Sequence, residues 1–367
     1  MNIGINARHL IENKLEGIGW YSFEVLRRLV LLRPQDNFYF FYDRKTKPLV
    51  ESVNLKNVIV YPSARHPILF KFWFNNRLPY YFKKFNIDLF FSPDGFLSLN
   101  TSVRQIGVIH DINFEHYPED LPKNVLRYYQ KYMPLFAKKA NKIITVSSFS
   151  KKDICNNYGL KEDKVHVIYN GGNEMYKPIP NKERKDFVSN NNSGRPYFIY
   201  VGSLHKRKNI LRMLSAFKAF NSDKKTMDFI IIGEKMWENQ MDLHELLENV
   251  KFLGRKSGHE LAKWVASSCG LVYVSYFEGF GLPVLEGMMA GVPVITSNVT
   301  SMPEVGGDAV IYVDPFDEVS IARGMTTAFN EGENFVKLGL KQSGKFSWDK
   351  SVSELESVIS NVLLHKE

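Results

Sequence analysis

Glu278 and Glu286 lie on either side of a glycine-rich loop, in the sequence Glu-Gly-Phe-Gly-Leu-Pro-Val-Leu-Glu. Proline is tolerated at a first helical position, so the sequence predicts a helix that begins at Gly281–Val284. The unpaired N–H groups and positive dipole end of such a helix favour an anion. A carboxylate does not, so we expect Glu278 and Glu286 to accept hydrogen bonds from sugar or ribose hydroxyls. The structural alternative is that Glu286 favours a helix start and that Glu278 is solvated.

The basic residues Arg207 and Lys208 are the second candidates. They follow the predicted strand Tyr197–Val201 and Gly202, and they precede an amphipathic helix. Arginine can bind two phosphate oxygens at once, and lysine binds phosphate as a point charge. We therefore predict that Arg207 and Lys208 bind a diphosphate, with a solvated turn as the alternative.

His110 and Asp111 directly follow the predicted strand Arg104–Ile109. Ligands of open α/β sheets bind at the carboxyl ends of the strands, so this position makes His110 a candidate site residue. A single histidine at a strand end is nevertheless more often structural. Asp111 could cap the next turn or position His110.

Gly17 and Gly19 separate the first predicted strand, Asn2–Asn6, from a predicted helix over Trp20–Leu32. Glycines between a first strand and a first helix are typical of a phosphate or ligand loop in a doubly wound fold. A flexible turn is the alternative.

Short apolar runs alternate with helical stretches along the chain, which predicts an α/β fold with parallel sheets. The polar tract Asn181–Arg195 is interpreted as a linker, so domains are expected at 1–180 and 181–349. In the first half we expect further strands at Phe38–Tyr42, Val58–Tyr61, Asp88–Phe91, Lys142–Val146 and Val165–Tyr169. In the second half we expect strands at Asp228–Ile232, Val250–Leu253, Leu271–Val274, Val292–Thr296 and Ala309–Val313, and helices near Asn209–Phe220, Asp242–Glu248, Gly258–Ser267, Pro283–Ala290 and Val319–Phe329.

The composition is that of a globular protein: 367 residues, 44% hydrophobic and 24% charged. The formal charge of +9 favours anionic partners. No apolar run reaches the roughly 18 residues of a spanning helix, and the N-terminus lacks a secretory core. Cys155 and Cys269 show no metal-ligand spacing, so we expect reduced thiols and a cytoplasmic protein.

The stretch of residues 65–85 is rich in aromatic side chains, with basic residues between them. One interpretation is a core-facing helix with solvated cations. The other is a peripheral contact with an anionic membrane surface, on the inner face of the plasma membrane. Nucleic-acid binding is not expected, because no recognised nucleic-acid module is present.

Five segments together resemble the retaining GT-B glycosyltransferases of family 4, in particular bacterial polysaccharide mannosyltransferases. They are EGIGWYSFEVLRRL, VIHDINFEHYPEDLP, VGSLHKRKNILRML, EGFGLPVLEGMMAGVPVITS and SMPEVGGDAVIYVDPFD, and they occur in the family's order. The resemblance implies two Rossmann-like, doubly wound domains that face a central cleft. The N-terminal domain would be on the acceptor side, and a C-terminal helix over 350–367 would pack back on it.

The resemblance also implies roles for the candidate residues. Arg207 and Lys208 would bind the donor diphosphate, Glu278 and His110 the donor sugar, and Glu286 the ribose. Two departures from the family's pattern, Ser203 for a common arginine and Asn209 for a common glycine, would place more of the phosphate binding on Lys208. Further substrate-binding positions implied by the resemblance are Gly17, Gly19, Asp111, Gly202, Gly254 and Arg255 beside the nucleobase, Phe280, Gly281, Leu282 and Pro283.

The function that the resemblance implies is retaining transfer of a hexose, first of all mannose from GDP-mannose, to a glycan or lipid-linked oligosaccharide in surface polysaccharide (O-antigen) synthesis. No metal or other cofactor is expected. Rhamnosyl or glucosyl transfer from dTDP- or UDP-sugars, a GT-B sugar-nucleotide 2-epimerase, and a binding protein on an inactive scaffold are the alternatives. Retention could use a carboxylate nucleophile or same-face attack with the departing phosphate as base. We favour the second route, because Glu278 is interpreted as sugar-binding.

Overall fold

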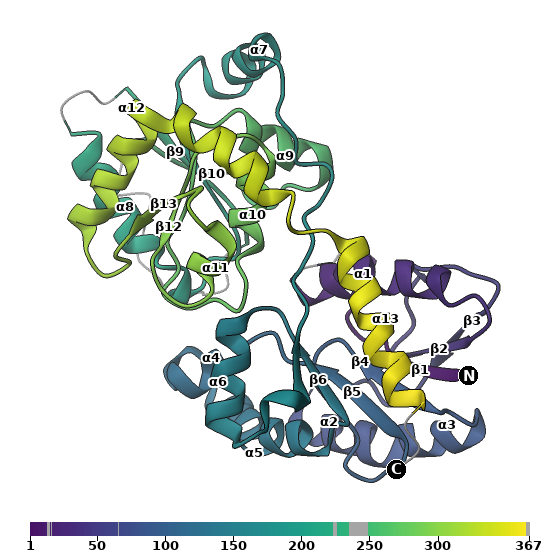
Figure 1. Cartoon of the computed structure of the whole chain (residues 1–367). Coiled ribbons are helices and arrows are strands. Elements are labelled where there is room, and N and C mark those ends of the chain that lie inside the picture. Colours follow the sequence, from purple (N-terminus) through teal and green to yellow (C-terminus); the bar gives the residue numbers. More distant parts are fainter. Residues whose placement is uncertain (13–14, 16, 65, 223–225, 235–248, 365–367) are drawn as a thin grey trace. The chain divides into compact units, whose positions relative to one another are not determined.

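A computed structural model describes residues 1–12, 15, 17–64, 66–222, 226–234 and 249–364, and divides the chain into two compact units (Figure 1). Unit 1 comprises Met1–Gly171 and Ser347–Glu367, and unit 2 comprises Gly172–Phe346. The division predicted from the sequence lay between residues 180 and 181, and the C-terminal helix that packs back on the first domain was predicted at 350–367.

Unit 1 is built on a seven-stranded sheet with the order β3-β2-β1-β4-β5-β6-β7, and all its described strand pairs are parallel. The interior strand β1 places Ile3 beside Phe38 of β2 and Leu89 of β4. These side chains are fully buried, as expected for a parallel sheet covered on both faces. The strands are β1 (Asn2–Asn6), β2 (Asn37–Tyr42), β3 (Leu55–Ile59), β4 (Leu89–Ser92), β5 (Arg104–Val108), β6 (Lys142–Thr145) and β7 (Val165–Val167).

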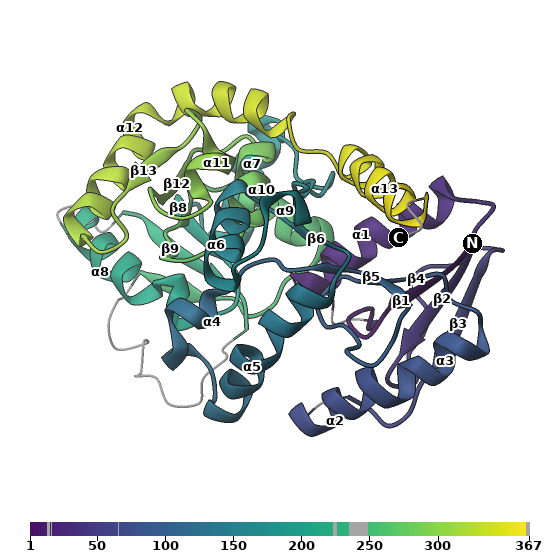
Figure 2. The same cartoon turned by 60° about the horizontal axis from the view of Figure 1, so that its bottom comes forward.

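Helices cover both faces of this sheet, with α1 and α13 on one face and α2, η1 and α3 on the other (Figure 2). The C-terminal helix α13 lies along α1 and is held there by an ion pair between Arg28 and Asp349 (2.7 Å) and another between Arg33 and Glu356 (2.7 Å). The helical elements of unit 1 are α1 (Ile18–Leu32), α2 (Pro67–Phe72), η1 (Trp73–Arg77), α3 (Leu78–Lys84), α4 (Asn113–His116), η2 (Pro118–Asp120), α5 (Lys123–Lys139), α6 (Ser148–Tyr158), η3 (Glu162–Lys164) and α13 (Trp348–Leu364).

Unit 2 repeats the architecture with a six-stranded parallel sheet of order β10-β9-β8-β11-β12-β13. Its strands are β8 (Tyr197–Val201), β9 (Asp228–Ile232), β10 (Val250–Phe252), β11 (Gly270–Tyr273), β12 (Val294–Ser297) and β13 (Ile311–Val313). Its helical elements are α7 (Asn181–Asn192), η4 (Lys206–Lys208), α8 (Ile210–Phe220), α9 (Gly258–Ala266), α10 (Leu282–Met289), α11 (Met302–Gly306) and α12 (Glu318–Ser343). The two parallel α/β sheets confirm the predicted fold class.

The segment interpreted as a linker is instead helix α7, and this interpretation was wrong. The helix is mostly polar, but Phe187 packs edge-to-face on Trp264 of α9, with ring centroids 5.2 Å apart. Arg184 adds hydrogen bonds to the carbonyl groups of Ser267 and Ser268. Two side chains thus attach a polar helix to unit 2, which average composition does not reveal. The predicted helix Asp242–Glu248 lies outside the described residues.

The basic aromatic segment forms three consecutive helical elements, α2, η1 and α3, with one face in the core and some apolar side chains exposed. Its larger side chains, such as Trp73, Phe74 and Phe82, are buried in the core of unit 1. Ile68, Phe72 and Tyr80 remain exposed, by 72%, 43% and 57%. Among the helices that the structure describes, none combines the length and the apolar character needed to cross a membrane.

Candidate functional site

Three of the predicted site residues, Arg207, Lys208 and Glu278, come together in unit 2. With Tyr273, which was not predicted, they form what we call the glutamate–cation cluster. The turn η4 after β8 supplies both cations, and the loop before α10 supplies Glu278. Arg207 Nη1 lies 2.9 Å from Glu278 Oε2, and Lys208 Nζ pairs with Glu278 Oε1. Tyr273, at the end of β11, accepts a hydrogen bond from Lys208 (2.6 Å) and donates one to Glu278 (3.0 Å).

The electrostatics of this cluster keep Glu278 ionised. The carboxylate is 7% exposed, and burial alone would raise its pKa. The neighbouring charges of Arg207 and Lys208 outweigh that effect and lower the pKa to about 2. Two cations and one carboxylate leave the cluster with one excess positive charge, which can attract an anion.

Asn209 explains how the cations are held. This residue adopts the left-handed conformation (φ 61°), which asparagine tolerates better than most residues. Its side-chain amide donates to the carbonyl oxygens of Val274 (3.1 Å) and Pro315 (2.6 Å). The asparagine therefore makes the turn that a glycine would make, and it also fixes Lys208 next to the Glu278 loop.

The helix start that the sequence predicts is confirmed at α10. Gly281 is the N-cap residue, with Leu282 and Pro283 in the first two helical positions. The φ angle of Gly281 is 98°, and a Cβ atom there would lie 2.5 Å from Cε of Met302, so no larger residue fits without movement. The preceding loop is fixed by Ser301, whose hydroxyl donates to the carbonyl oxygens of Glu278 (2.9 Å) and Phe280 (3.1 Å).

Glu286 lies on α10 and has a different environment from Glu278. Its carboxyl group is surrounded by protein, although part of the side chain remains accessible, and burial raises its pKa to about 8. A hydrogen bond with Tyr176 opposes this rise only in part. At neutral pH Glu286 is therefore mainly protonated, and its carboxyl can both donate and accept a hydrogen bond.

The predicted base-side residues lie at the carboxyl ends of β8, β9 and β10. Gly233 links them: its N–H donates to the carbonyl of Gly254 (3.0 Å), and a Cβ at Gly233 would lie 1.8 Å from the carbonyl oxygen of Gly202. The structure thus brings Gly202 and Gly254 to one closely packed backbone surface. Arg255 extends from this surface and lies 3.6 Å from the carboxylate of Glu234.

In unit 1, His110 is held at the carboxyl end of β5. Its Nε2 lies 2.9 Å from the carbonyl oxygen of Pro93, and its ring packs edge-to-face on Tyr21 with centroids 4.8 Å apart. Burial lowers the pKa of His110, so the neutral ring predominates. A carbonyl oxygen can only accept, which places the proton on Nε2 and leaves Nδ1 as an acceptor. Asp111 caps the next turn, because its Oδ1 accepts from the N–H of Asn113 (3.1 Å).

The two N-terminal glycines lie where the sequence predicts, at the start of α1. Gly17 is the N-cap residue and accepts the hydrogen bond from the Tyr21 N–H (3.0 Å). Gly19 packs against the backbone of His9, and a Cβ at Gly19 would lie 3.0 Å from the His9 carbonyl oxygen. The ligands assigned to Gly17, Gly19 and the other site residues remain predictions.

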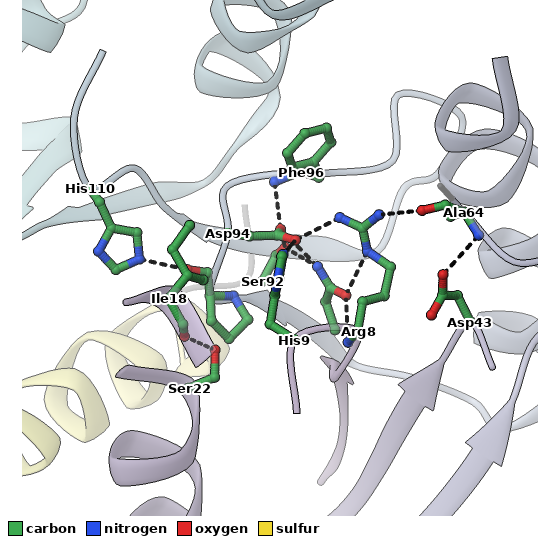
Figure 3. A network of polar contacts seen from close by, with 12 residues as sticks. Arg8, His9, Ile18, Ser22, Asp43, Ala64, Ser92, Asp94, Phe96 and His110 are labelled. Atoms are coloured by element: carbon green, nitrogen blue, oxygen red, sulfur yellow. Dashed lines mark hydrogen bonds and ion pairs between the residues drawn. The ribbon is translucent and has the colours of Figure 1, made fainter. Parts of the chain in front are cut away.

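Sequence reasoning missed a second polar cluster, the Asp94 network (Figure 3), which consists of Asn6, Arg8, His9, Ser92, Asp94 and Phe96. Arg8 Nη2 lies 2.6 Å and His9 Nε2 lies 3.1 Å from Asp94 Oδ2. The signal that could have found it is the one that identified His110: polar residues directly after strands. Arg8 and His9 follow β1, and Asp94 follows β4. Tyr176 and Tyr273 were also missed, because nothing local distinguishes them from other tyrosines.

Within the described ranges, no group of three or more histidine, cysteine, aspartate or glutamate side chains is arranged to hold a metal ion.

Comparisons with known proteins cover nearly the whole chain. Residues 17–173 match the family model described as Glycosyltransferase Family 4, and residues 181–341 match Glycosyl transferases group 1. O-antigen chain mannosyltransferase B of Escherichia coli is 28% identical over 95% of this chain and 97% of its own length. O-antigen chain mannosyltransferase RfbU of Salmonella typhimurium is 30% identical over 59% of this chain and 58% of its own. Sucrose-phosphate synthase from Thermosynechococcus elongatus has a similar fold, with a TM-score of 0.78, 16% identity and 99% of both chains covered.

Proposed function

Because the chain belongs to the GT-B glycosyltransferases of group 1 and family 4, we propose that it transfers mannose from GDP-mannose to a hydroxyl of a glycan or lipid-linked oligosaccharide. The family is retaining and uses nucleotide-sugar donors. The names of the two relatives support mannose as the sugar and a bacterial surface polysaccharide as the product. Donors of other hexoses are outcomes of the experiment below.

The observation that carries this proposal is the glutamate–cation cluster beside the start of α10. Transfer releases a nucleoside diphosphate, and the negative charge that grows on it must be stabilised. Arg207 and Lys208 supply an excess positive charge, and the N-terminal turn of α10 supplies backbone N–H groups and a favourable dipole. These groups would bind the leaving diphosphate.

The same cluster supports same-face attack over a double displacement. A double displacement requires a carboxylate nucleophile. Both oxygens of Glu278 pair with cations, and the pKa of this carboxyl is lowered to about 2, which makes it a weak nucleophile. We assign Glu278 to binding of the sugar hydroxyls, and the departing phosphate to removal of the acceptor proton.

The remaining assignments follow the chemistry of each group. Glu286 can exchange hydrogen bonds with both ribose hydroxyls through its protonated carboxyl. Gly254 and Arg255 would border the nucleobase, as part of the glycine surface at the ends of β8 to β10. His110, with its neutral Nδ1, would accept a hydrogen bond from a donor-sugar hydroxyl.

We further propose that residues 66–85 contact an anionic membrane at the cytoplasmic face. The exposed side chains of Ile68, Phe72 and Tyr80 share this segment of the chain with the exposed lysines Lys71, Lys83 and Lys84. The segment contains no acidic residue. Apolar side chains surrounded by cations suit the headgroup region of a bilayer that carries negative charge. A lipid-linked acceptor would be presented at such a surface.

The test is nucleotide-dependent thermal stabilisation, with GDP, UDP, dTDP and ADP each measured with and without EDTA. A ligand that binds only the folded state raises the melting temperature by mass action. We expect GDP to give the largest rise, with no change on addition of EDTA. A larger rise with UDP or dTDP would instead identify a glucosyl or rhamnosyl donor.

A matched pair of variants links the signal to the cluster. Lys208→Ala removes a cation from the cluster, and Lys206→Ala removes one from the exposed position two residues earlier. We expect Lys208→Ala to weaken GDP binding at least about tenfold, as for loss of a charged hydrogen bond, and Lys206→Ala to have little effect. Absence of a shift with every nucleotide, or equal effects of both variants, would contradict the assignment.

A further inference from the structure

Resting on the proposed transferase function, we propose that His9 binds the acceptor hydroxyl and that Asp94 positions it. His9 lies in the turn directly after β1, and its Nε2 is 3.1 Å from Oδ2 of Asp94. Neither residue was among the site residues predicted from the sequence. His9 touches substrate in this assignment, whereas Asp94 acts through His9.

Asp94 is held too firmly to be a mobile surface carboxylate. Its side chain is 2% exposed and accepts hydrogen bonds from Asn6 (2.8 Å), Ser92 (2.9 Å) and the N–H of Phe96 (3.1 Å). Burial would raise the pKa of this carboxyl, but the charge of Arg8 and the contact with His9 lower it instead. A carboxylate fixed in this way holds its hydrogen-bond partners in a defined orientation.

The buried partner of Asp94 is Arg8, which lies among aromatic rings. Its guanidinium carbon is 4.8 Å from the ring centroid of Phe74, 5.1 Å from that of Phe70 and 5.2 Å from that of Phe96. Arg8 and Asp94 therefore neutralise each other within the core, at 2.6 Å. Arg8 supplies the larger part of the charge that stabilises the buried carboxylate of Asp94, and His9 adds to it.

His9 is the exposed end of this network, with a side chain 44% accessible (Figure 3). The ionised carboxylate of Asp94 can only accept a hydrogen bond, so Nε2 of His9 carries a proton and donates the hydrogen bond. In the neutral ring Nδ1 then keeps its lone pair and can accept a hydrogen bond from a hydroxyl group. A histidine that is oriented on one side and accessible on the other is suited to hold a small polar group.

The charge of the network indicates a neutral ligand rather than a phosphate. Arg8 and Asp94 cancel each other, so this ion pair carries no excess positive charge, in contrast to the glutamate–cation cluster. His110, at the end of β5 in the same unit, presents a neutral Nδ1 in the same way. Sugar hydroxyls can donate to histidine nitrogens of this kind, so the acceptor hydroxyl is the group that this edge of unit 1 fits best.

The experiment measures transfer from GDP-mannose to a panel of octyl glycosides (α-mannoside, α-rhamnoside, β-galactoside and β-N-acetylglucosaminide), together with hydrolysis of the donor by water. We expect His9→Ala to lower kcat/KM for the acceptor at least about tenfold, as for loss of one hydrogen bond in the transition state. The KM for the donor and the rate of donor hydrolysis should stay within about twofold of the wild-type values. His259→Ala, at an exposed position of α9 in unit 2, is the matched control.

Two amide variants separate acceptor binding from a structural role. The amide of asparagine lies near the position of Nδ1, and that of glutamine lies near Nε2. His9→Asn should therefore retain more transfer than His9→Gln, whose amide can pair with Asp94 only. The reverse order, or an unchanged kcat/KM in His9→Ala, would overturn the inference while leaving the transferase function intact. If the wild-type protein neither transfers to any glycoside nor hydrolyses any nucleotide sugar, the proposed function fails and this inference fails with it.

Discussion

Glu278 and Glu286 are two enclosed carboxyl groups of one loop-and-helix segment whose pKa values are shifted in opposite directions. Arg207 and Lys208 lower the pKa of Glu278 to about 2, whereas burial raises the pKa of Glu286 to about 8, and no cation among the described residues pairs with it. Neighbouring carboxyl groups with divergent pKa values are typical of functional sites, because structural stability alone does not require them. The divergence supports different roles for the two residues, one as a charged acceptor and one as a neutral donor and acceptor.

The raised pKa of Glu286 predicts how stability depends on pH. Above its ordinary pKa of 4.5 the unfolded chain loses the proton, while the folded protein keeps it up to about pH 8. The folded state then binds more protons than the unfolded state, so stability falls as pH rises through this range. Glu286→Gln cannot ionise, so we expect a melting temperature close to that of the wild-type protein at about pH 4, below the ordinary pKa, and several degrees higher at about pH 9.

The matched control for Glu286→Gln is Glu331→Gln, which removes the same charge from an exposed position of α12. Differential scanning calorimetry of all three proteins at both pH values gives the comparison. A parallel decline of the Glu286→Gln and wild-type melting temperatures with pH would show that Glu286 is already ionised at neutral pH. Its assignment as a hydrogen-bond donor would then be wrong.

At the scale of elements, the sequence predicted those features that neighbouring residues determine by themselves. Apolar runs with β-branched residues predicted the parallel strands, and Gly281 with Pro283 predicted where α10 begins. The sequence patterns gave the wrong secondary structure where an element depends on a few contacts with distant residues. Helix α7 is polar except for Phe187 and Val188, so its composition indicated a linker.

For the candidate site, too, the sequence predicted individual residues but not the contacts between them. Glu278 was recognisable because it precedes a glycine-rich loop, and Arg207 and Lys208 because they lie in a basic run between a strand and a helix. Their mutual pairing was not predictable, since 70 residues separate Lys208 from Glu278. The Asp94 network spans 88 residues, from Asn6 to Asp94, and depends on strand β4 lying next to β1. Strand order follows from the packing of the whole sheet, which no single segment reveals.

The start of α10 makes the proposed phosphate site sensitive to one methyl group. Gly281 has a φ of 98°, and an added Cβ would overlap with the buried side chain of Met302 at 2.5 Å. We expect Gly281→Ala to lower the free energy of unfolding by about 1–3 kcal/mol. We also expect it to weaken nucleotide binding at least about tenfold, because the first turn of the helix must shift. Chemical denaturation and titration with GDP measure the two effects.

Gly159, the C-cap residue of α6, is the matched control for Gly281→Ala. It also has a positive φ (62°), but an added Cβ would meet no atom within 4 Å. Gly159→Ala should therefore cost about 1 kcal/mol of stability from backbone strain alone and leave GDP binding unchanged. If Gly281→Ala binds GDP as tightly as Gly159→Ala, the helix start does not hold the diphosphate.

At the scale of the whole molecule, the formal charge of +9 has two very different uses in the proposed function. In unit 2 the two cations of the glutamate–cation cluster, Arg207 and Lys208, are largely enclosed and pair with Glu278. This arrangement suits recognition of one diphosphate. On the surface of unit 1 the cations of residues 66–85 are exposed and lie beside exposed apolar side chains. A protein that uses only its net charge would bind anionic vesicles through any basic region, whereas a dedicated membrane surface would depend on this segment.

Two charge-reversed variants separate these possibilities. Lys83→Glu/Lys84→Glu changes the proposed membrane segment, and Lys182→Glu/Lys185→Glu changes exposed lysines of α7 by the same amount. Each cation near an anionic bilayer contributes about 1 kcal/mol, so the first variant should bind phosphatidylcholine vesicles that contain phosphatidylglycerol at least about thirtyfold more weakly than the wild-type protein. The second should bind nearly as well as wild type, and none of the three should bind pure phosphatidylcholine tightly. Equal losses in the two variants in a sedimentation assay would mean that net charge governs association, because both variants carry the same total charge and differ only in where it lies.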